Sequence, residues 1–153
     1  MKTCLLVLLF ALAFVTCGAQ NSVKDELTAF TVLKNGRQRI ATIRVPAGYK
    51  EKTNSYAEGV FTTLTYPDGS YIVLQIGGMM KLPLFTEPRH HVFQRQVLSD
   101  RVVRGGTVQN TELRWREENS QAVFPPTNIG FANVPKDRLK IFERSLRSFT
   151  RAR

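Results

Sequence analysis

Two runs of β-forming residues flank a tight turn near the middle of the chain, and this pattern restricts the fold more than any other feature. Residues 60–66 and 70–76 are rich in Val, Ile, Thr, Phe and Tyr, which suit a pleated, half-buried surface. Between them lies Pro67-Asp68-Gly69. Proline presets the backbone for the first central position of a turn, and glycine accepts a positive φ. The sequence therefore predicts an antiparallel hairpin and, with it, a sheet.

Other strands are predicted on both sides of this hairpin. Residues 27–34 and 37–45 flank Asn35-Gly36, a dipeptide typical of two-residue hairpin turns. Residues 50–58 are mostly polar and are predicted to form a loop. The remaining predicted strands are residues 101–103 and 107–117, on either side of Gly105-Gly106, and residues 128–134.

Residues 135–149 are predicted to form an amphipathic helix. Pro135 is tolerated at a first helical position, and at about 100° per residue the apolar side chains fall on one face. These side chains are Leu139, Phe142, Leu146 and Phe149. Thr86-Glu87-Pro88 has residues that can begin a helix, so a second helix over residues 86–98 is included in the expectation. The predicted fold class is α+β: a mostly antiparallel β-sheet with the C-terminal helix packed on one face.

The first 19 residues have the layout of a secretory signal peptide. Lys2 precedes an uncharged apolar run, and small residues follow that run. Signal peptidase I would cut after Ala19 and leave a single α+β domain over residues 20–153. Alternatively, residues 14–17 (FVTC) resemble a bacterial lipobox, in which case Cys17 is lipidated and the cut falls before it. The first cut predicts a periplasmic or secreted protein, and the second a protein anchored by lipid to the outer membrane of a Gram-negative bacterium.

The net charge of +10 at pH 7 indicates a partner of opposite charge. The expected partner is an unknown protein or an anionic envelope component, such as a lipid headgroup, lipopolysaccharide or acidic polysaccharide. Export argues against nucleic acid, and membrane association is expected only if Cys17 is lipidated. The alternative is that the positive charge only keeps the domain soluble. Cys4 and Cys17 are the two cysteines, so the exported domain has no pair for a disulfide, as is common in bacterial envelope proteins.

Cations gather on the outer face of the predicted C-terminal helix and on one predicted strand. The helix cations fall within a narrow arc opposite the apolar stripe, as a docking surface for an anionic partner would. A merely solvated helix face has the same pattern. The two strand arginines either extend this patch or line the open face of the sheet. The candidate binding residues are Lys140, Arg144, Arg147, Arg151, Arg114 and Arg116.

An apolar run interrupted by Pro83 is a second candidate contact surface. If the run is exposed, it forms an apolar patch of the kind that marks a partner site. If it is buried, it closes the core. The residues concerned are Met79, Met80, Leu82, Leu84 and Phe85.

The sequence carries no recognisable catalytic motif. It lacks the nucleophile-elbow, phosphate-loop, zinc-protease and dinucleotide signatures. His90 and His91 are adjacent and therefore point in different directions, and Glu117 and Glu118 would face opposite sides of a strand. No metal, cofactor or catalytic residue is predicted, and the protein is expected not to be an enzyme. The alternatives are a small hydrolase whose site is assembled from residues distant in sequence, and a structural lipoprotein.

Three stretches carry a resemblance to known proteins: residues 45–49 (VPAGY), 66–72 (YPDGSYI) and 142–149 (FERSLRSF). On these, the chain resembles uncharacterised small exported envelope proteins of Bacteroidetes-type bacteria. More loosely, its strand-rich body and terminal helix resemble PsbP/Mog1-like domains. That resemblance implies an antiparallel sheet with helices on its faces and a role in binding or assembly, with no shared catalytic residues. We therefore expect an exported, non-catalytic protein that binds through a basic surface, as an assembly or accessory factor or as an inhibitor or immunity-type protein.

Overall fold

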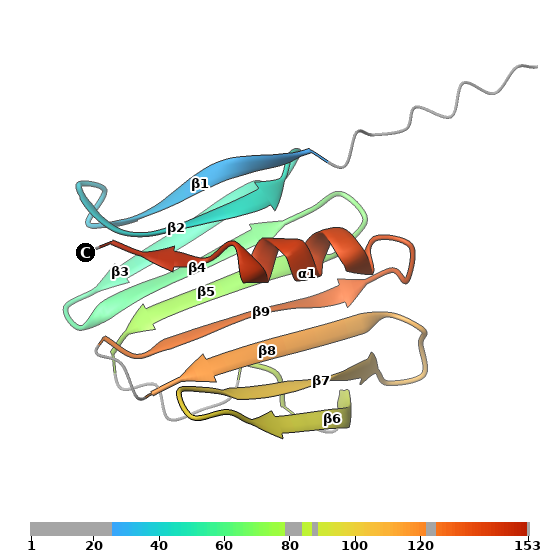
Figure 1. The fold of residues 1–153 in the computed structure, drawn as a ribbon. Coiled ribbons are helices and arrows are strands. Elements are labelled where there is room, and N and C mark those ends of the chain that lie inside the picture. Colours follow the sequence, from blue (N-terminus) through green and yellow to red (C-terminus); the bar gives the residue numbers. More distant parts are fainter. Residues whose placement is uncertain (1–25, 79–83, 87–88, 122–124, 153) are drawn as a thin grey trace, which may run out of the picture.

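The computed structural model describes residues 26–78, 84–86, 89–121 and 125–152 of the chain. Within these residues, ten strands and one helix form two layers (Figure 1). No helix in this part of the chain has the length and apolar character that crossing a bilayer requires. In chain order the elements are β1 (Leu27–Lys34), β2 (Gln38–Pro46), β3 (Lys50–Tyr56), β4 (Gly59–Thr65), β5 (Tyr71–Gly77), β6 (His90–Val97), β7 (Val102–Val108), β8 (Arg114–Ser120), β9 (Thr127–Val134), α1 (Leu139–Arg147) and β10 (Thr150–Arg151).

The larger layer is a seven-stranded antiparallel sheet with the order β3-β4-β5-β9-β8-β7-β6. The smaller layer contains a three-stranded sheet, β1-β2-β10, with α1 beside it. α1 packs on β2 and on β9, so the second layer covers the β4-β5-β9 part of the large sheet (Figure 1). The predicted mostly antiparallel sheet with a C-terminal helix on one face is confirmed.

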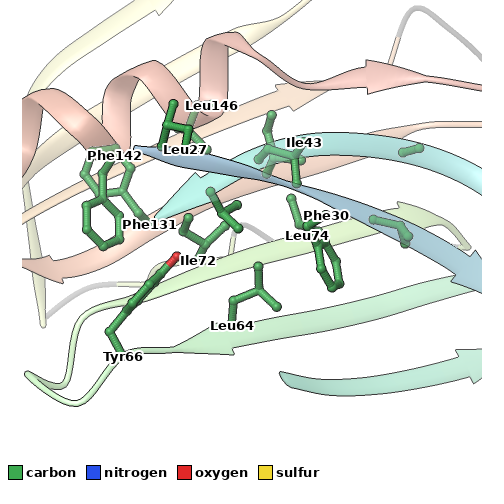
Figure 2. Close-up of a cluster of buried hydrophobic side chains, with 14 of the residues drawn as sticks. Leu27, Phe30, Ile43, Leu64, Tyr66, Ile72, Leu74, Phe131, Phe142 and Leu146 are labelled. Atoms are coloured by element: carbon green, nitrogen blue, oxygen red, sulfur yellow. The ribbon is translucent and has the colours of Figure 1, made fainter. Parts of the chain in front are cut away.

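The main core lies between these two layers (Figure 2). Successive side chains of a strand point to opposite faces, so the pairing of Leu64 with Ile72 and of Ile72 with Phe131 aligns one apolar face across β4, β5 and β9. From the second layer, Ile43 and Phe142 reach into the same space and are almost fully buried. Each such side chain contributes about 1.5–3 kcal/mol by leaving water. This burial holds the helix onto the sheet.

A smaller core lies on the opposite face of the large sheet. Phe85, Trp115 and Ala132 are buried there. The indole Nε1 of Trp115 lies 3.2 Å from the carbonyl oxygens of both His91 and Thr107 and donates to them. The segment that contains Phe85 therefore packs across β8 and β9 on the side away from α1.

The two predicted hairpin turns are present. At the first, Asn35 and Gly36 have φ of 51° and 66°, the left-handed conformation that a two-residue hairpin turn needs. At the second, Gly69 has φ of 81°, and its N–H donates to the carbonyl of Tyr66 at 3.0 Å. Local turn chemistry thus positions both hairpins.

The predicted helix over residues 86–98 is wrong, because residues 90–97 form strand β6. The spacing of Phe93 and Val97, four residues apart, favours a helix only if both side chains pack on a common surface. Both are exposed, at 71% and 65%. Pairing of β6 with β7, interrupted by a bulge between Val92 and Gln94, decides the conformation instead.

Two loop predictions also differ from the structure. Residues 50–56, predicted as loop, form β3, an edge strand whose side chains are all exposed, so a polar composition does not exclude it. Gly105-Gly106 lies within β7 rather than between strands, and the turn comes later, at Asn110 with φ of 57°. A Cβ at position 106 would collide with the carbonyl oxygen of His91, so glycine is needed there for the close approach of β6 and β7.

The C-terminal helix is shorter than the predicted span of 135–149. It covers Leu139–Arg147 and is followed by β10, which pairs with β2. Ser148 ends the helix: its Oγ accepts a hydrogen bond from the backbone N–H of Arg44 at 2.8 Å. At the other end, the guanidinium of Arg138 lies over the Tyr66 ring and pairs with Asp68. Tertiary contacts therefore set both helix ends.

Candidate functional site

A groove runs along α1, between this helix and the outer strands of the large sheet. It consists of two hollows, one of about 270 Å³ near the start of the helix and one of about 760 Å³ near its end and β10. Arg116 lines both hollows. We call the two together the α1 groove.

The floor of the groove follows from strand register. On β9, Phe131 and Ile129 face the main core, and their partners on β8 are Arg116 and Glu118. The same face therefore changes from apolar to charged where the second layer ends. Gly105 of β7 lies opposite Arg116 and adds no side chain to the floor. The part of this face formed by β8 and β7, beyond the main core, is thus both hollow and polar.

Basic residues outnumber acidic ones in the groove. The basic residues lining it are Arg101, Arg104, Arg114, Arg116, Lys136, Arg147 and Arg151, and the acidic residues are Asp100, Glu118 and Glu143. Arg104 directs its guanidinium to Glu117 on the other face of the sheet, which leaves six cations against three carboxylates. A concave surface with an excess of one sign of charge concentrates ligands of the other sign.

Glu118 organises the arginines of the floor. Its Oε1 accepts hydrogen bonds from Arg116 at 3.0 and 3.2 Å, and its Oε2 lies 3.7 Å from Nε of Arg101. The Glu118 side chain is only 14% exposed. One partly buried carboxylate therefore orients two guanidinium groups and cannot neutralise both.

The wall contributes two further arginines. Arg147 lies 3.7 Å from Glu143 across one helical turn, and its side chain remains 72% exposed. Arg151 lies on β10, and its Nη2 donates to Thr127 Oγ1 at 2.9 Å. Burial lowers the pKa of Arg151, yet arginine starts far enough above neutrality to remain charged. An anionic partner would meet oriented arginines on the floor and the largely exposed Arg147 on the wall.

The six predicted binding residues divide into two groups. Arg114, Arg116, Arg147 and Arg151 line the α1 groove. Lys140 and Arg144 are exposed on α1 and do not line either hollow. Because the helix ends at Arg147, Arg151 is not part of a helical stripe. Arg114 and Arg116 lie on the face of the sheet beside α1, and Arg116 lines the same hollow as Arg147 and Arg151.

Sequence reasoning did not include Arg101, Lys136 or Glu118 in the candidate site. The sequence does indicate that Glu118 belongs with two of the predicted residues. Arg114, Arg116 and Glu118 are spaced two residues apart and therefore share one face of β8. No local pattern connects them with Lys136 or Arg101, which join the groove through the fold.

The predicted apolar contact run is described only in part. Met79, Met80 and Leu82 lie outside the described residues, as do Cys17 and the predicted signal peptide. Leu84 is half-buried and Phe85 is 2% exposed, and both pack in the second core. These two residues close a core.

A buried charged cluster that the sequence did not reveal secures the segment around Phe85. Glu117 is 2% exposed; its Oε1 accepts hydrogen bonds from Leu84 N–H at 2.9 Å and Asn128 Nδ2 at 2.8 Å, and its Oε2 pairs with Arg104 at 3.2 Å. Arg104 also donates to the carbonyl of Phe85 at 2.6 Å. The predicted opposite orientation of Glu117 and Glu118 is confirmed, with one in this cluster and the other in the groove.

The two histidines have different surroundings. The His90 ring contacts the rings of Phe85 and Trp115, with centroids 5.1 and 5.4 Å away, and its Nδ1 lies 3.0 Å from the carbonyl of Thr86. His91 is exposed. In the part of the chain that the structure describes, no group of His, Cys, Asp and Glu side chains is arranged to hold a metal ion.

Comparison with protein-family models, with curated proteins and with solved structures gives no match.

Proposed function

We propose that this is an exported binding protein whose α1 groove takes an anionic partner. The observation that supports the proposal most strongly is the gathering of six cations, from four strands or turns and one helix, around hollows that contain only three carboxylates. The partner is an acidic protein or another anionic component of the bacterial envelope. Export rests on the N-terminal apolar segment, and attachment to a membrane would require lipidation of Cys17.

The composition of the groove suits oxyanions. Five of the six cations are arginines, whose planar guanidinium groups bind carboxylate and phosphate oxygens in a two-pronged geometry. Apolar side chains of Leu146 and Phe149 lie beside them in the larger hollow. A partner with both anionic and apolar groups would use both kinds of contact.

The test compares two double variants with the same change of charge. Arg114→Ser/Arg116→Ser removes two cations from the groove, and Lys50→Ser/Lys52→Ser removes two exposed cations from the distant edge strand β3. The probe is a fluorescent oligoglutamate peptide, and its dissociation constant is measured by anisotropy at low and at physiological salt. We expect the groove variant to bind about tenfold more weakly, and the β3 variant to change by about twofold or less.

A third variant separates the groove from the outer face of the helix. Lys140→Ser/Arg144→Ser removes two cations that do not line either hollow. We expect it to resemble the β3 variant. Equal losses in all three variants would mean that the probe responds to net charge alone, and the proposed groove function would be abandoned.

A further inference from the structure

Strand β6 forms one end of the seven-stranded sheet, and among the described residues it pairs only with β7. An edge strand presents a row of backbone N–H and C=O groups on which another strand can pair. Every residue of β6 except His90 is exposed. The residues of β6 beyond His90 are therefore accessible to solvent.

The exposed large apolar side chains of the described residues are concentrated on this edge. They are Val92, Phe93 and Val97 on β6, with Tyr56 on β3. Proteins usually protect edge strands with charges, and β3, the other edge, has Lys50, Glu51 and Lys52 at its start. β6 has only Arg95. The two ends of the sheet thus differ in how strongly they discourage pairing.

Hydrogen bonding shows which β6 groups point outward. Leu98 N–H donates to the carbonyl of Arg101 at 2.8 Å, so these two residues form a hydrogen-bonded pair. Hydrogen-bonded and non-hydrogen-bonded pairs alternate in an antiparallel ladder. The pairs Val97–Val102 and Arg95–Arg104 are therefore non-hydrogen-bonded. The backbone groups of Arg95 and Val97 point away from β7, toward an added strand.

The edge is continuous with the α1 groove. A bulge between Val92 and Gln94 interrupts the register, and both Phe93 and Gln94 line the hollow near the start of α1. The bulge limits the regular part of the free edge to residues 94–97. A strand paired there would have one face beside the basic groove.

Charge identifies the kind of partner. Residues 89–99 contain Arg89 and Arg95 and no acidic residue. A second copy of the chain would bring the same cations to the edge, on a protein that already has a net charge of +10. An extended acidic segment would meet opposite charge both at the edge and in the groove. Charge complementarity therefore favours an acidic polypeptide over self-association.

We propose that β6 is a strand-addition site for an extended acidic segment of a partner protein, which pairs with residues 94–97 and directs its carboxylates toward the basic face. This inference rests on the proposed function, since it specifies the partner of the same surface as an acidic polypeptide. In such recognition the main-chain hydrogen bonds provide affinity, and the alternating side chains provide specificity.

The experiment uses the whole protein and two peptides of equal charge. The first alternates valine and glutamate over about ten residues, a length typical of a strand. In the second, two central valines are replaced by proline, which prevents strand pairing. We expect the first peptide to bind about tenfold more tightly. Amide hydrogen exchange measured by NMR should show that only the first peptide slows exchange at Arg95 and Val97, whose N–H groups point away from β7.

A pair of variants at one position isolates the backbone contribution. Val97→Pro removes an outward N–H, and Val97→Ala removes side-chain atoms but keeps that N–H. We expect Val97→Pro to weaken binding of the first peptide at least fivefold and Val97→Ala to change it by no more than about twofold. Hydrogen-exchange protection elsewhere in β6 and β7 checks that both variants keep the strand in place.

The outcomes separate this inference from the proposed function. Equal affinity for the two peptides, combined with weaker binding by Arg114→Ser/Arg116→Ser, would overturn strand addition and leave an anion-binding groove. No binding of either peptide or of oligoglutamate would overturn both. Protection of Arg95 and Val97 that increases with protein concentration, without peptide, would show that a second copy covers the edge and would also overturn the inference.

Discussion

Replacing Glu117 by alanine should destabilise the protein far more than replacing its neighbour Glu118. The Glu117 side chain is 3% exposed, and its carboxylate accepts hydrogen bonds from Leu84, Asn128 and Arg104. Without it, the charge of Arg104 loses its partner, and the Leu84 N–H and the Asn128 amide each lose an acceptor. Breaking one side of a buried ion pair costs about 3–5 kcal/mol. Since the Arg104 side chain is 26% exposed and water can reach it, we expect about 3 kcal/mol.

The matched control is Glu118→Ala. Glu118 also pairs with arginines, but it lies at the floor of the open α1 groove, where water can replace it. Its loss should cost about 1 kcal/mol or less. The double variant Arg104→Ala/Glu117→Ala should cost less than the sum of the two single variants, because removing both charges leaves neither unpaired.

Urea denaturation followed by tryptophan fluorescence measures these differences. Trp115 is the only tryptophan, and the Arg104 guanidinium lies 5.6 Å from its ring centroid, so the signal comes from the region of the change. The slope of the transition should stay constant while the midpoint shifts. Equal costs for Glu117→Ala and Glu118→Ala, or a cost below about 1 kcal/mol for Glu117→Ala, would refute the assigned role of the buried cluster.

Two further predictions concern the turn at Asp68 and the glycines of β7. Burial would raise the pKa of Asp68, but hydrogen bonds from Ser70 and Arg138 outweigh it and hold the pKa below its usual range. The wild-type protein should therefore be more stable than Asp68→Asn above about pH 4, and this difference in the free energy of unfolding should disappear as the pH falls further. A difference in urea midpoint that does not vary with pH would contradict this prediction. Gly106→Ala should lower the free energy of unfolding by at least about 2 kcal/mol in thermal or urea unfolding, because the added Cβ would collide with the backbone of His91. Gly105→Ala should cost less than about 1 kcal/mol, since its Cβ would lie 3.2 Å from the nearest atom, the carbonyl oxygen of Trp115. Similar costs for the two variants would argue against the close approach of β6 and β7.

Features governed by neighbouring residues could be predicted from the sequence. The turns at Asn35-Gly36 and Pro67-Asp68-Gly69 depend on which residues tolerate a positive φ, and the apolar spacing of Phe142 and Leu146 identifies the buried side of α1. The strand β6 could not be predicted in this way, since Phe93 and Val97 have helical spacing but pack on no common surface. Its conformation is set by pairing with β7, which sequence periodicity does not encode.

The candidate site shows the same division. Arg114 and Arg116 lie two residues apart, so their shared face on a strand is a local property. Their proximity to Lys136 and Arg151 depends on where α1 and β10 pack. The burial of Glu117 is equally non-local, because Glu117 and Glu118 have the same chemistry and only the position of the second core on one face of the sheet distinguishes them.

The pairing of β10 with β2 determines when the chain can fold. Thr150 lies opposite Thr42, and their hydroxyl groups are 2.8 Å apart although 108 positions separate them in sequence. The hairpin made early in synthesis therefore waits for nearly the last residues before the second edge of β2 is paired. Such long-range closure makes folding slow and leaves the growing chain open. Such a delay would suit the export proposed above, because an unfolded chain is the form that a secretion channel can thread.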